Sequence, residues 1–339
     1  MSRLCLSAPD LSDHLIREMS VGLRPFRETG YRLESVSLDG KRIVHNYGHG
    51  GAGVTLSYGC AFEVADSLGR LDGVHVAVLG GGVMGVTSAN VLACRGARVT
   101  VFSQAFSPHT TSDVAGAQWS PSYIEVGQWQ REQFGRILRR SFDAFVSLLE
   151  KDYGVYRRPN YTDQEGGHSF RAIPHGVLPP REELDRLPWH DVHCSGHVYQ
   201  TLLIEPSVFL ARLMADCELL GVAFMERRFE SVDEVLGLQQ DTVVNCLGLG
   251  AGRLFDDPLV HAVRGQLVLL EPQDLPWLLS HRDGYVFPRS DALVLGGTVE
   301  RGETDAICDE SVGEQILQRN RNFFTGGSGS GETSICESH

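Results

Sequence analysis

Residues 43–61 read Ile-Val-His-Asn-Tyr-Gly-His-Gly-Gly-Ala-Gly-Val-Thr-Leu-Ser-Tyr-Gly-Cys-Ala, an apolar pair, then a glycine-dense turn, then a periodic run. This order predicts a strand that enters a helix at a phosphate site, because glycines let backbone NH groups approach an anion and helix N-termini attract negative charge. Residues 74–85, Val-His-Val-Ala-Val-Leu-Gly-Gly-Gly-Val-Met-Gly, repeat the same architecture. Two helix N-termini directed at one anion predict a dinucleotide site.

The first of these segments also resembles a known fingerprint. His45 to Gly53, followed by Gly59 and Ala61, is similar to the signature of the D-amino-acid oxidase family, FAD enzymes that convert D-amino acids to 2-oxo acids. The resemblance covers about residues 9–324. In that family the Gly-x-Gly-x-x-Gly unit opens the chain and the His-Asn-Tyr-Gly segment nearly closes it, whereas here the His-Asn-Tyr-Gly segment comes first.

The reversed motif order implies a circularly permuted D-amino-acid oxidase architecture. A helix over residues 53–68 would run back across the sheet, and residues 69–73 would form a short bridge into the strand that begins at residue 74. The new chain ends would then fall between Phe324 and residues 7–16, on a surface connection.

Hydrophobic periodicity predicts an α/β fold. The expected strands lie at 74–79, 98–102 and 242–246, and the expected helices lie at 82–95, 131–151 and 205–220. Further strands at 265–270, 284–288 and 292–297 are assigned to a mixed sheet, joined by 36–38 and 42–44. The resemblance implies a Rossmann-type, glutathione-reductase-like parallel sheet that binds FAD, plus a mixed-sheet substrate domain.

These elements suggest a discontinuous domain organisation. The expected FAD-binding domain comprises residues 43–150 and 201–255, and the substrate-binding domain comprises residues 1–42, 151–200 and 256–324. Residues 325–339 contain Gly-Gly-Ser-Gly-Ser-Gly and lack apolar residues that could pack, so we expect a flexible tail.

Composition excludes several classes of function. The 339-residue chain is 42% hydrophobic and carries a net charge of −13, which argues against a nucleic-acid or anionic-membrane partner. Its eight cysteines and thirteen histidines show no metal-ligand spacing, so no metal is expected. Because no basic region precedes an apolar core at the N-terminus, we expect a cytoplasmic protein.

The resemblance implies non-covalent FAD and a set of contacts to it. The strand that ends at residue 102 is followed by neutral Ser103 and Gln104, where dinucleotide sites usually place an acid, so cofactor affinity is expected to be low for the family. The expected cofactor-binding residues are Gly50, Gly51, Gly53, Val54, Thr55, Gly80, Gly82, Val83, Met84, Gly85, Gln104, Thr110, Thr111, Ala115, Gly116 and Phe229.

Alternatives remain for each of these motifs. The Gly80 turn taken alone is compatible with a tight turn that binds nothing. Residues 107–116 are compatible with a polar turn in which Asp113 caps a helix. Arg264-Gly265-Gln266 matches a short family motif, but an ordinary structural turn is the favoured interpretation.

Two side chains are the expected catalytic and substrate-binding residues. In the family, the arginine of a Gly-x-Arg-Pro segment clamps the substrate α-carboxylate, which implies this role for Arg24 in Gly22-Leu23-Arg24-Pro25. Tyr285 would be its tyrosine partner, with Gly51 also lining the substrate site. The alternatives are a surface arginine and a core tyrosine.

The lid that precedes Tyr285 in mammalian enzymes would be short here, because only residues 280–284 occupy that place. Arg282 is a substrate-binding candidate, since a cation beside the side-chain pocket would favour acidic D-amino acids; the alternative is a solvated loop arginine.

The expected function is FAD-dependent oxidative deamination of D-amino acids by O2, giving 2-oxo acids, ammonia and H2O2. Hydride transfer from the substrate Cα to flavin N5 would need orientation rather than an acid–base dyad. The alternatives are a D-aspartate oxidase, a glycine or secondary-amine oxidase of the same superfamily, and a catalytically inert flavin-binding protein. The expected partners are small molecules, and a homodimer is left open.

Overall fold

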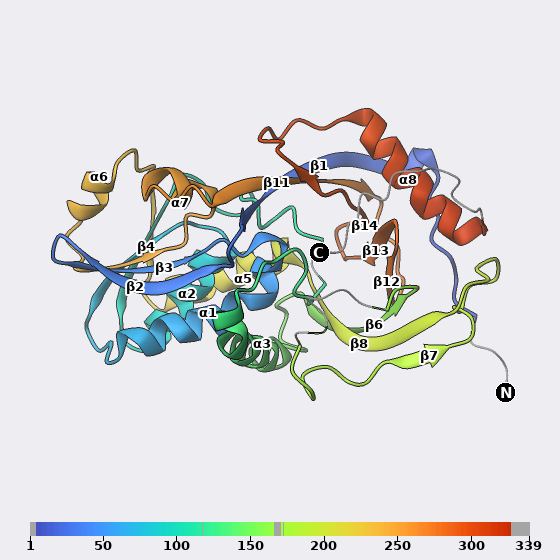
Figure 1. Cartoon of the computed structure of the whole chain (residues 1–339). Helices are drawn as coiled ribbons and strands as arrows, with labels where there is room; N and C mark the ends of the chain where they lie inside the picture. The colour runs from blue at the N-terminus through green and yellow to red at the C-terminus, as the bar shows by residue number, and fades with distance from the viewer. Residues whose placement is uncertain (1–4, 117, 166–170, 172, 327–339) are drawn as a thin grey trace.

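The computed structural model describes residues 5–116, 118–165, 171 and 173–326. Its strands form two sheets, which occupy the two halves of the molecule in Figure 1. The six-stranded sheet has the order β2 (Arg32–Leu38), β3 (Lys41–Tyr47), β10 (Thr242–Asn245), β4 (His75–Leu79), β5 (Arg98–Ser103) and β9 (Ala223–Glu226). All neighbours in this sheet are parallel except β2, which is antiparallel to β3.

The nine-stranded sheet is mixed. Its order is β1 (Ile16–Arg27), β11 (Val260–Leu270), β14 (Leu293–Gly296), β13 (Gly284–Pro288), β12 (Leu278–His281), β6 (Val155–Thr162), β8 (Gly196–Ile204) and β7 (Glu182–Leu184), and β15 (Glu300–Arg301) pairs with β11. Only the β12–β6 pair is parallel among these pairings.

Helices cover both sheets. The described helices are α1 (Gly53–Leu68), α2 (Val83–Cys94), α3 (Arg131–Val146), α5 (Pro206–Leu219), α6 (Val232–Leu236), α7 (Leu249–Leu254) and α8 (Glu310–Thr325), with short 3-10 turns η1 (Asp13–Leu15), η2 (Gly50–Ala52) and η3 (Gln128–Gln130). Helix α1 packs against α2 and α3, and α2 packs against α5. Helix α8 lies against β11, β13 and β14.

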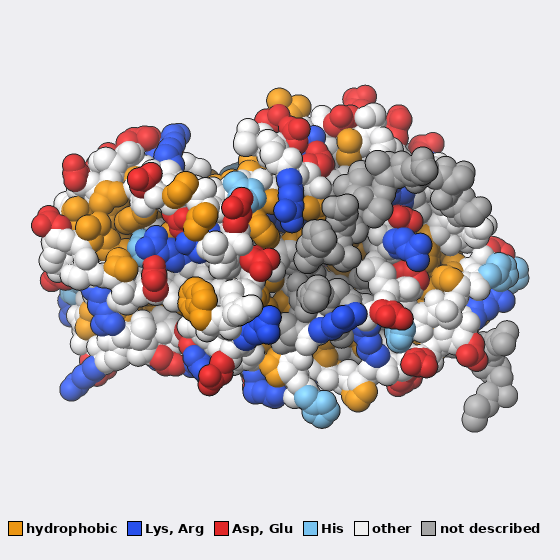
Figure 2. Space-filling view, in the orientation of Figure 1, with side chains coloured by type: hydrophobic (Ala, Val, Ile, Leu, Met, Phe, Trp, Pro, Cys, Tyr) orange, Lys and Arg blue, Asp and Glu red, His pale blue; other side chains and the backbone are white. Residues whose placement is uncertain are grey.

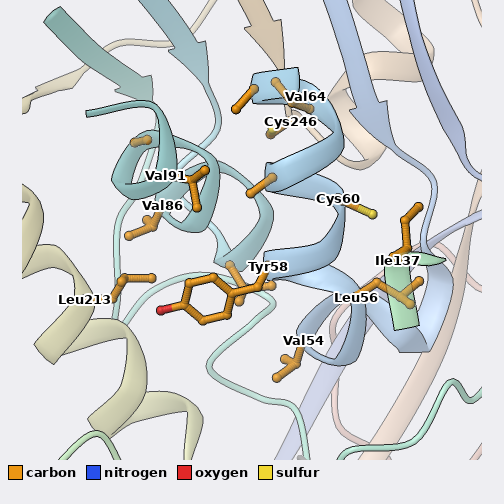
Figure 3. Packing of buried hydrophobic residues seen from close by; sticks show 14 of the residues in the cluster. Val54, Leu56, Tyr58, Cys60, Val64, Val86, Val91, Ile137, Leu213 and Cys246 are labelled. Atoms are coloured by element: carbon orange, nitrogen blue, oxygen red, sulfur yellow. The ribbon is translucent and has the colours of Figure 1, made fainter. Parts of the chain in front are cut away.

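Small residues on α1 permit this close packing. A Cβ built on Gly59 would lie 2.1 Å from the backbone oxygen of Ile137 in α3, so only glycine fits. On the other side of α1, Tyr58 is directed between α1 and α5, toward Leu213 (Figure 3). The expected helix over 53–68 is therefore confirmed, and it is held mainly by neighbouring helices.

The parallel strands lie close to where the sequence predicts them. The expected strands at 74–79, 98–102 and 242–246 correspond to β4, β5 and β10, and buried apolar residues fill them, as expected when helices cover both faces of a parallel sheet. The helices expected over 82–95 and 205–220 are α2 and α5. The helix expected over 131–151 ends earlier, at Val146.

Two expectations were wrong. Residues 36–38 and 42–44 belong to β2 and β3 of the six-stranded sheet, because β3 pairs with β10 over Arg42–His45, and they do not join the mixed sheet. Residues 32–38 therefore lie with the parallel strands and not with the substrate domain to which 1–42 was assigned. The remaining domain boundaries stay predictions, and the tail beyond Gly326 lies outside the described residues.

Strands β1 and β11 are the longest pair and run along the top of both halves in Figure 1. At the end of this pair, the buried Asp257 carboxylate accepts hydrogen bonds from Arg27 Nε at 2.9 Å and from Tyr47 Oη at 2.8 Å. Burial alone would raise the pKa of Asp257, but the bonds from Arg27 and Tyr47 outweigh it and hold that pKa below its usual value. One carboxylate thus ties the end of β1 to β3.

We expect Asp257→Asn to lower the free energy of unfolding by about 1.5–3 kcal/mol at pH 7, because hydrogen bonds to a charged group are lost. The folded-state pKa is depressed, so this stabilisation is present above the unfolded value and is lost as the pH falls through the folded one. The difference from the parent should therefore shrink below about pH 4. Urea unfolding followed across pH measures it.

Asp256→Asn is the matched control, because it removes the same charge from an exposed neighbour whose φ of 50° asparagine tolerates. Equal stabilities of the Asp257→Asn variant and the control at pH 7 would contradict the role given to Asp257.

Candidate functional site

A cavity of about 1450 Å³ lies along the carboxyl ends of the parallel strands and extends to the nine-stranded sheet. Strands β3, β10 and β4 pair in parallel, with His45, Asn245 and Leu79 in register, so their carboxyl ends meet at one edge. Both glycine turns predicted from the sequence leave this edge and line the cavity. This is the place where open α/β sheets bind ligands.

Two helices begin at the cavity wall. Neither α1 nor α2 has a side-chain cap: their N-cap residues are Ala52 and Gly82. The first-turn NH groups of each helix lack intrahelical partners, which makes both N-termini suitable for an anion. One exception is Val83, whose NH donates to Ser112 Oγ at 3.0 Å.

The glycines of the second turn have different roles. A Cβ built on Gly82 would meet only Ser112 Oγ, at 3.0 Å, within 4 Å, so the fold leaves this face of the turn open to the cavity. Gly80 has a φ of 113°, which favours glycine. Gly85 does not line the cavity: its Cβ would lie 1.9 Å from the Gly80 oxygen, so it allows α2 to pack on the turn. A contact between Gly85 and the cofactor stays a prediction, and the packing of α2 on the turn already accounts for a glycine at this position.

The other expected cofactor-binding residues all line the cavity. These are Gly50, Gly51, Gly53, Val54, Thr55, Gly80, Gly82, Val83, Met84, Gln104, Thr110, Thr111, Ala115, Gly116 and Phe229. Gln104 follows β5, and the buried Phe229 lies edge-on to Phe102, with ring centroids 5.9 Å apart. Their individual contacts with a cofactor stay predictions.

Asp113 organises the loop between β5 and the substrate end. Its carboxylate accepts from the backbone NH of Thr110 at 2.9 Å and from the Thr110 hydroxyl at 2.7 Å. No helix starts at Asp113, so the cap interpretation does not hold, and the residue instead stabilises a turn that faces the cavity.

Two histidines, His45 at the end of β3 and His49 in the first glycine turn, stabilise this segment. Burial lowers the pKa of His45 to about 4 and that of His49 to about 3, so both are neutral near pH 7. His45 Nδ1 lies 3.1 Å from the Asn245 side chain, and the His49 ring stacks on Tyr31. They hold β3 and the turn in place.

Arg24 lies on β1 at the opposite end of the cavity. Its Nη1 donates to the backbone oxygens of Thr298 at 3.1 Å and Arg264 at 3.2 Å. A Cβ on Gly265 would lie 2.2 Å from Nη2, so the guanidinium lies flat on a glycine of β11. Among the described residues Arg24 forms no ion pair with a carboxylate, which leaves its charge available to an anion.

Residues 264–266 are part of this arrangement and not a turn. They lie inside β11, with Gly265 opposite Gly22 of β1. The turn interpretation was wrong because the motif is paired along its whole length with a strand some 240 residues earlier.

Tyr285 lies on β13 near Arg24. Glycines surround its ring: a Cβ on Gly296 would lie 1.8 Å from it, and a Cβ on Gly116 would lie 2.8 Å from its hydroxyl. Burial raises the pKa of Tyr285, and the charges of Arg24 and Arg289 offset part of that rise. The structure therefore brings Arg24 and Tyr285 into one electrostatic environment.

Arg282 and Gly51 also line the cavity. Arg282 is exposed in the two-residue turn between β12 and β13, and its backbone NH donates to Asp163 Oδ1 at 3.0 Å. The segment before Tyr285 is thus a tight hairpin.

Sequence reasoning missed four side chains of this end of the cavity: Gln118, Tyr123, Arg181 and Tyr199. The Tyr123 ring lies 5.4 Å from Arg24 Cζ and is 41% exposed at the cavity edge. Its φ of 52° is unusual for a non-glycine residue, and such a backbone angle cannot be read from the sequence. Tyr199 lies on β8, whose sequence, with Val198, Tyr199 and the apolar run 202–204, is rich in residues that favour strands.

The cavity fits FAD. Two uncapped helix N-termini and the open face of Gly82 offer a diphosphate site, and the cavity continues from there toward Phe229 on one side and Tyr285 on the other. Within the described ranges, no helix is long and apolar enough to cross a membrane, and no cluster of histidine, cysteine and acidic side chains is arranged to hold a metal. A cytoplasmic location and a homodimer stay predictions.

Comparison with known proteins agrees with this geometry. The sequence model of the family DAO, described as FAD dependent oxidoreductase, matches residues 75–335. The chain is 32% identical to the D-amino-acid oxidase of Streptomyces coelicolor, over 72% of this chain and 76% of that protein. It is 30% identical to the D-aspartate oxidase of Homo sapiens, over 74% and 75%, and 27% identical to the D-amino acid oxidase of Dugesia ryukyuensis, over 75% and 78%. The chain belongs to the DAO family of FAD-dependent oxidoreductases, and FAD is its cofactor.

Proposed function

We propose that the protein oxidises D-amino acids with O2: amino acid, O2 and water give the 2-oxo acid, ammonia and H2O2. The observation that carries this proposal is the flat placement of Arg24 on Gly265, near Tyr285, in the same cavity as the two glycine turns. The names of the relatives from Streptomyces coelicolor and Dugesia ryukyuensis support the choice of D-amino acids.

Arg24 would hold the substrate α-carboxylate. Its Nη1 is already used by two carbonyl oxygens, which fix the plane of the guanidinium, and the remaining donors can form charge-assisted bonds with an anion. The Tyr285 hydroxyl would add a neutral hydrogen bond. Bound FAD supplies a two-electron acceptor. The residues of the chain contribute orientation, because a fixed carboxylate presents the Cα–H bond in one direction.

The order of the motifs supports a second proposal, that the chain is a circular permutation of the family architecture. The family-model match begins at residue 75, after the His-Asn-Tyr-Gly segment. Arg321 of α8 donates to the Leu11 oxygen and pairs with Asp13, which brings the late helix to the early segment. This contact lies where a permuted chain would have new ends.

The function is tested by a peroxide assay of the purified protein, supplied with FAD, against a panel of D- and L-amino acids. We expect peroxide with D-amino acids and none with their L-enantiomers. Bound flavin without peroxide on any D-amino acid would favour a catalytically inert flavoprotein instead.

Arg24→Ala should lower kcat/KM by several orders of magnitude with FAD still bound, because two bonds to the carboxylate are lost. Arg24→Lys should recover little of this loss, since a point charge cannot reproduce the guanidinium fork. Tyr285→Phe should do less harm, because it removes one neutral hydrogen bond. Steady-state turnover of the best D-amino acid is measured for all three variants. Near-parental turnover by Arg24→Ala would show that another residue binds the substrate carboxylate.

Gly82→Val should abolish flavin absorbance without unfolding the protein. The backbone of Gly82 has a φ of −80° and a ψ of −177°, which valine adopts, and its Cβ faces open space apart from Ser112 Oγ. The added methyl groups would therefore occupy the approach to the diphosphate. FAD occupancy and the thermal midpoint of the apoprotein are measured together. Full FAD occupancy in the folded variant would disprove the proposal that the diphosphate binds at the Gly82 turn.

A further inference from the structure

Arg289 is a buried cation that lies behind the cavity wall. On the face of the molecule shown in Figure 2, arginine and lysine side chains lie at the surface among acidic ones. Arg289 is instead only 7% exposed, and it is not one of the residues that line the cavity. A buried charge is costly unless it is paired and hydrogen-bonded, so its partners indicate what it does.

These partners lie on two different segments. The Arg289 Nε and Nη2 groups donate to the two carboxylate oxygens of Asp291, at 2.7 and 2.6 Å, within the turn between β13 and β14. Its Nη1 donates to the backbone oxygen of Ala115 at 3.1 Å. Ala115 belongs to the loop after β5 that lines the cavity. One guanidinium therefore joins the turn after β13 to a loop of the cavity wall.

This loop also contacts Tyr285. Alternate residues of a strand share one face, so Tyr285 and Phe287 lie side by side on β13, and Arg289 continues the alternation just beyond it. The rings of Tyr285 and Phe287 stack with their centroids 4.3 Å apart. A Cβ built on Gly116 would lie 2.8 Å from the tyrosine hydroxyl. The loop thus lies across this row, bonded to Arg289 at one end and in contact with Tyr285 at the other.

The turn that carries Arg289 is fixed to the other half of the molecule. The Ser290 NH donates to Glu205 Oε1 at 2.6 Å, and the Ser207 hydroxyl donates to Asp291 Oδ2 at 3.2 Å. Both partners lie at the start of α5, which packs against α2, the helix that begins at the second glycine turn. The turn therefore has a defined position relative to the cofactor end of the cavity.

Arg289 acts on Tyr285 by its charge as well. Burial raises the pKa of Tyr285, and the positive charges of Arg24 and Arg289 oppose that rise. Arg24 lines the cavity and Arg289 does not, so the tyrosine lies between one cation that a ligand can reach and one that it cannot.

We propose that Arg289 is a positioning residue, which holds residues 115–116 against Tyr285 and so fixes the tyrosine hydroxyl where the substrate carboxylate binds. This inference rests on the proposed function and adds to that site a residue that does not touch the substrate. Arg24 binds the carboxylate directly, whereas Arg289 acts through the loop and the tyrosine.

A double-mutant cycle with Tyr285→Phe tests this role. Arg289→Met removes the donors and should lower kcat/KM for the best D-amino acid about 3–10-fold, no more than Tyr285→Phe does, because both lose the same hydrogen bond. Most of the loss should lie in KM, since the carboxylate is bound alike in the ground state and the transition state. In the Tyr285→Phe background, Arg289→Met should lower kcat/KM less than about twofold, because the hydroxyl is already absent.

Arg17→Met is the matched control. Arg17 Nη1 donates to the backbone oxygen of Asp291 at 2.5 Å, so this variant removes the same charge from the same turn without a bond to Ala115. Its side chain is 47% exposed, and we expect kcat/KM to stay within about twofold of the parent. Arg289→Lys keeps the charge but cannot serve both partners, so it should recover part of the loss. The lysine variant carries the cycle if the methionine variant does not fold.

Butyrate, a carboxylate without an amino group, gives a readout that needs no turnover. Its binding, followed by perturbation of the flavin absorbance, should weaken about 3–10-fold in Arg289→Met and less than about twofold when Tyr285→Phe is already present.

FAD affinity is measured in the same variants. The cofactor part of the loop is held independently of Arg289, by the bonds from Thr110 to the Asp113 carboxylate and from the Val83 NH to Ser112 Oγ. We therefore expect the FAD dissociation constant of Arg289→Met to stay within about twofold of the parent value.

The outcomes separate this inference from the proposed function. Equal losses of kcat/KM in the two backgrounds, unchanged butyrate binding, or release of FAD by Arg289→Met would overturn the positioning role and leave the oxidation of D-amino acids intact. Absence of peroxide with every D-amino acid would overturn the proposed function, and the butyrate cycle would still show whether Arg289 positions Tyr285 toward a carboxylate.

Discussion

The position of Arg24, the proposed substrate clamp, relative to the first glycine turn depends on the Asp257 carboxylate. It accepts from Arg27 at the end of β1 and from Tyr47 at the end of β3, and it precedes β11 by a few residues. Strand β1 belongs to the nine-stranded sheet and carries Arg24, whereas β3 belongs to the six-stranded sheet and leads into the first glycine turn. A single buried anion therefore connects the two sheets where a rigid relation between them is needed.

The second constraint on the site is the need for glycine at several positions. These glycines matter less for backbone flexibility than because, without a Cβ, they let other groups approach the backbone closely. Gly265 lets the Arg24 guanidinium lie on the backbone of β11, and Gly296 gives the Tyr285 ring its place. Gly82 leaves one face of the second turn open to the cavity, whereas Gly85 only lets α2 pack. The same residue type thus makes room for a ligand at one position and for the protein itself at another, and sequence spacing does not distinguish the two.

The sequence was most informative where structure is local. A strand, a glycine turn and a helix follow one another within about 25 residues in both units, so hydrophobic period and turn chemistry predicted β4, α2 and α1. Residues 265–270 of β11 were predicted as a strand, but β1 and its pairing with β11 were missed. The two strands are distant in the chain, and Gly22, Pro25 and several arginines lower the strand propensity of β1. The place of Arg181 in the cavity lining could not be found from sequence, since it comes from contacts with residues brought together by folding.

For the proposed oxidation, the charge of Arg24 accounts for activity without a catalytic base. An amine that is to lose a hydride from the adjacent carbon must be neutral, and a positive environment favours the neutral form because like charges raise the free energy of an ammonium group. Arg24 donates to carbonyl oxygens rather than to a carboxylate, so its charge is not cancelled by the protein. Under the proposed function, the charge of Arg24 therefore attracts the α-carboxylate of the substrate and disfavours the protonated amine.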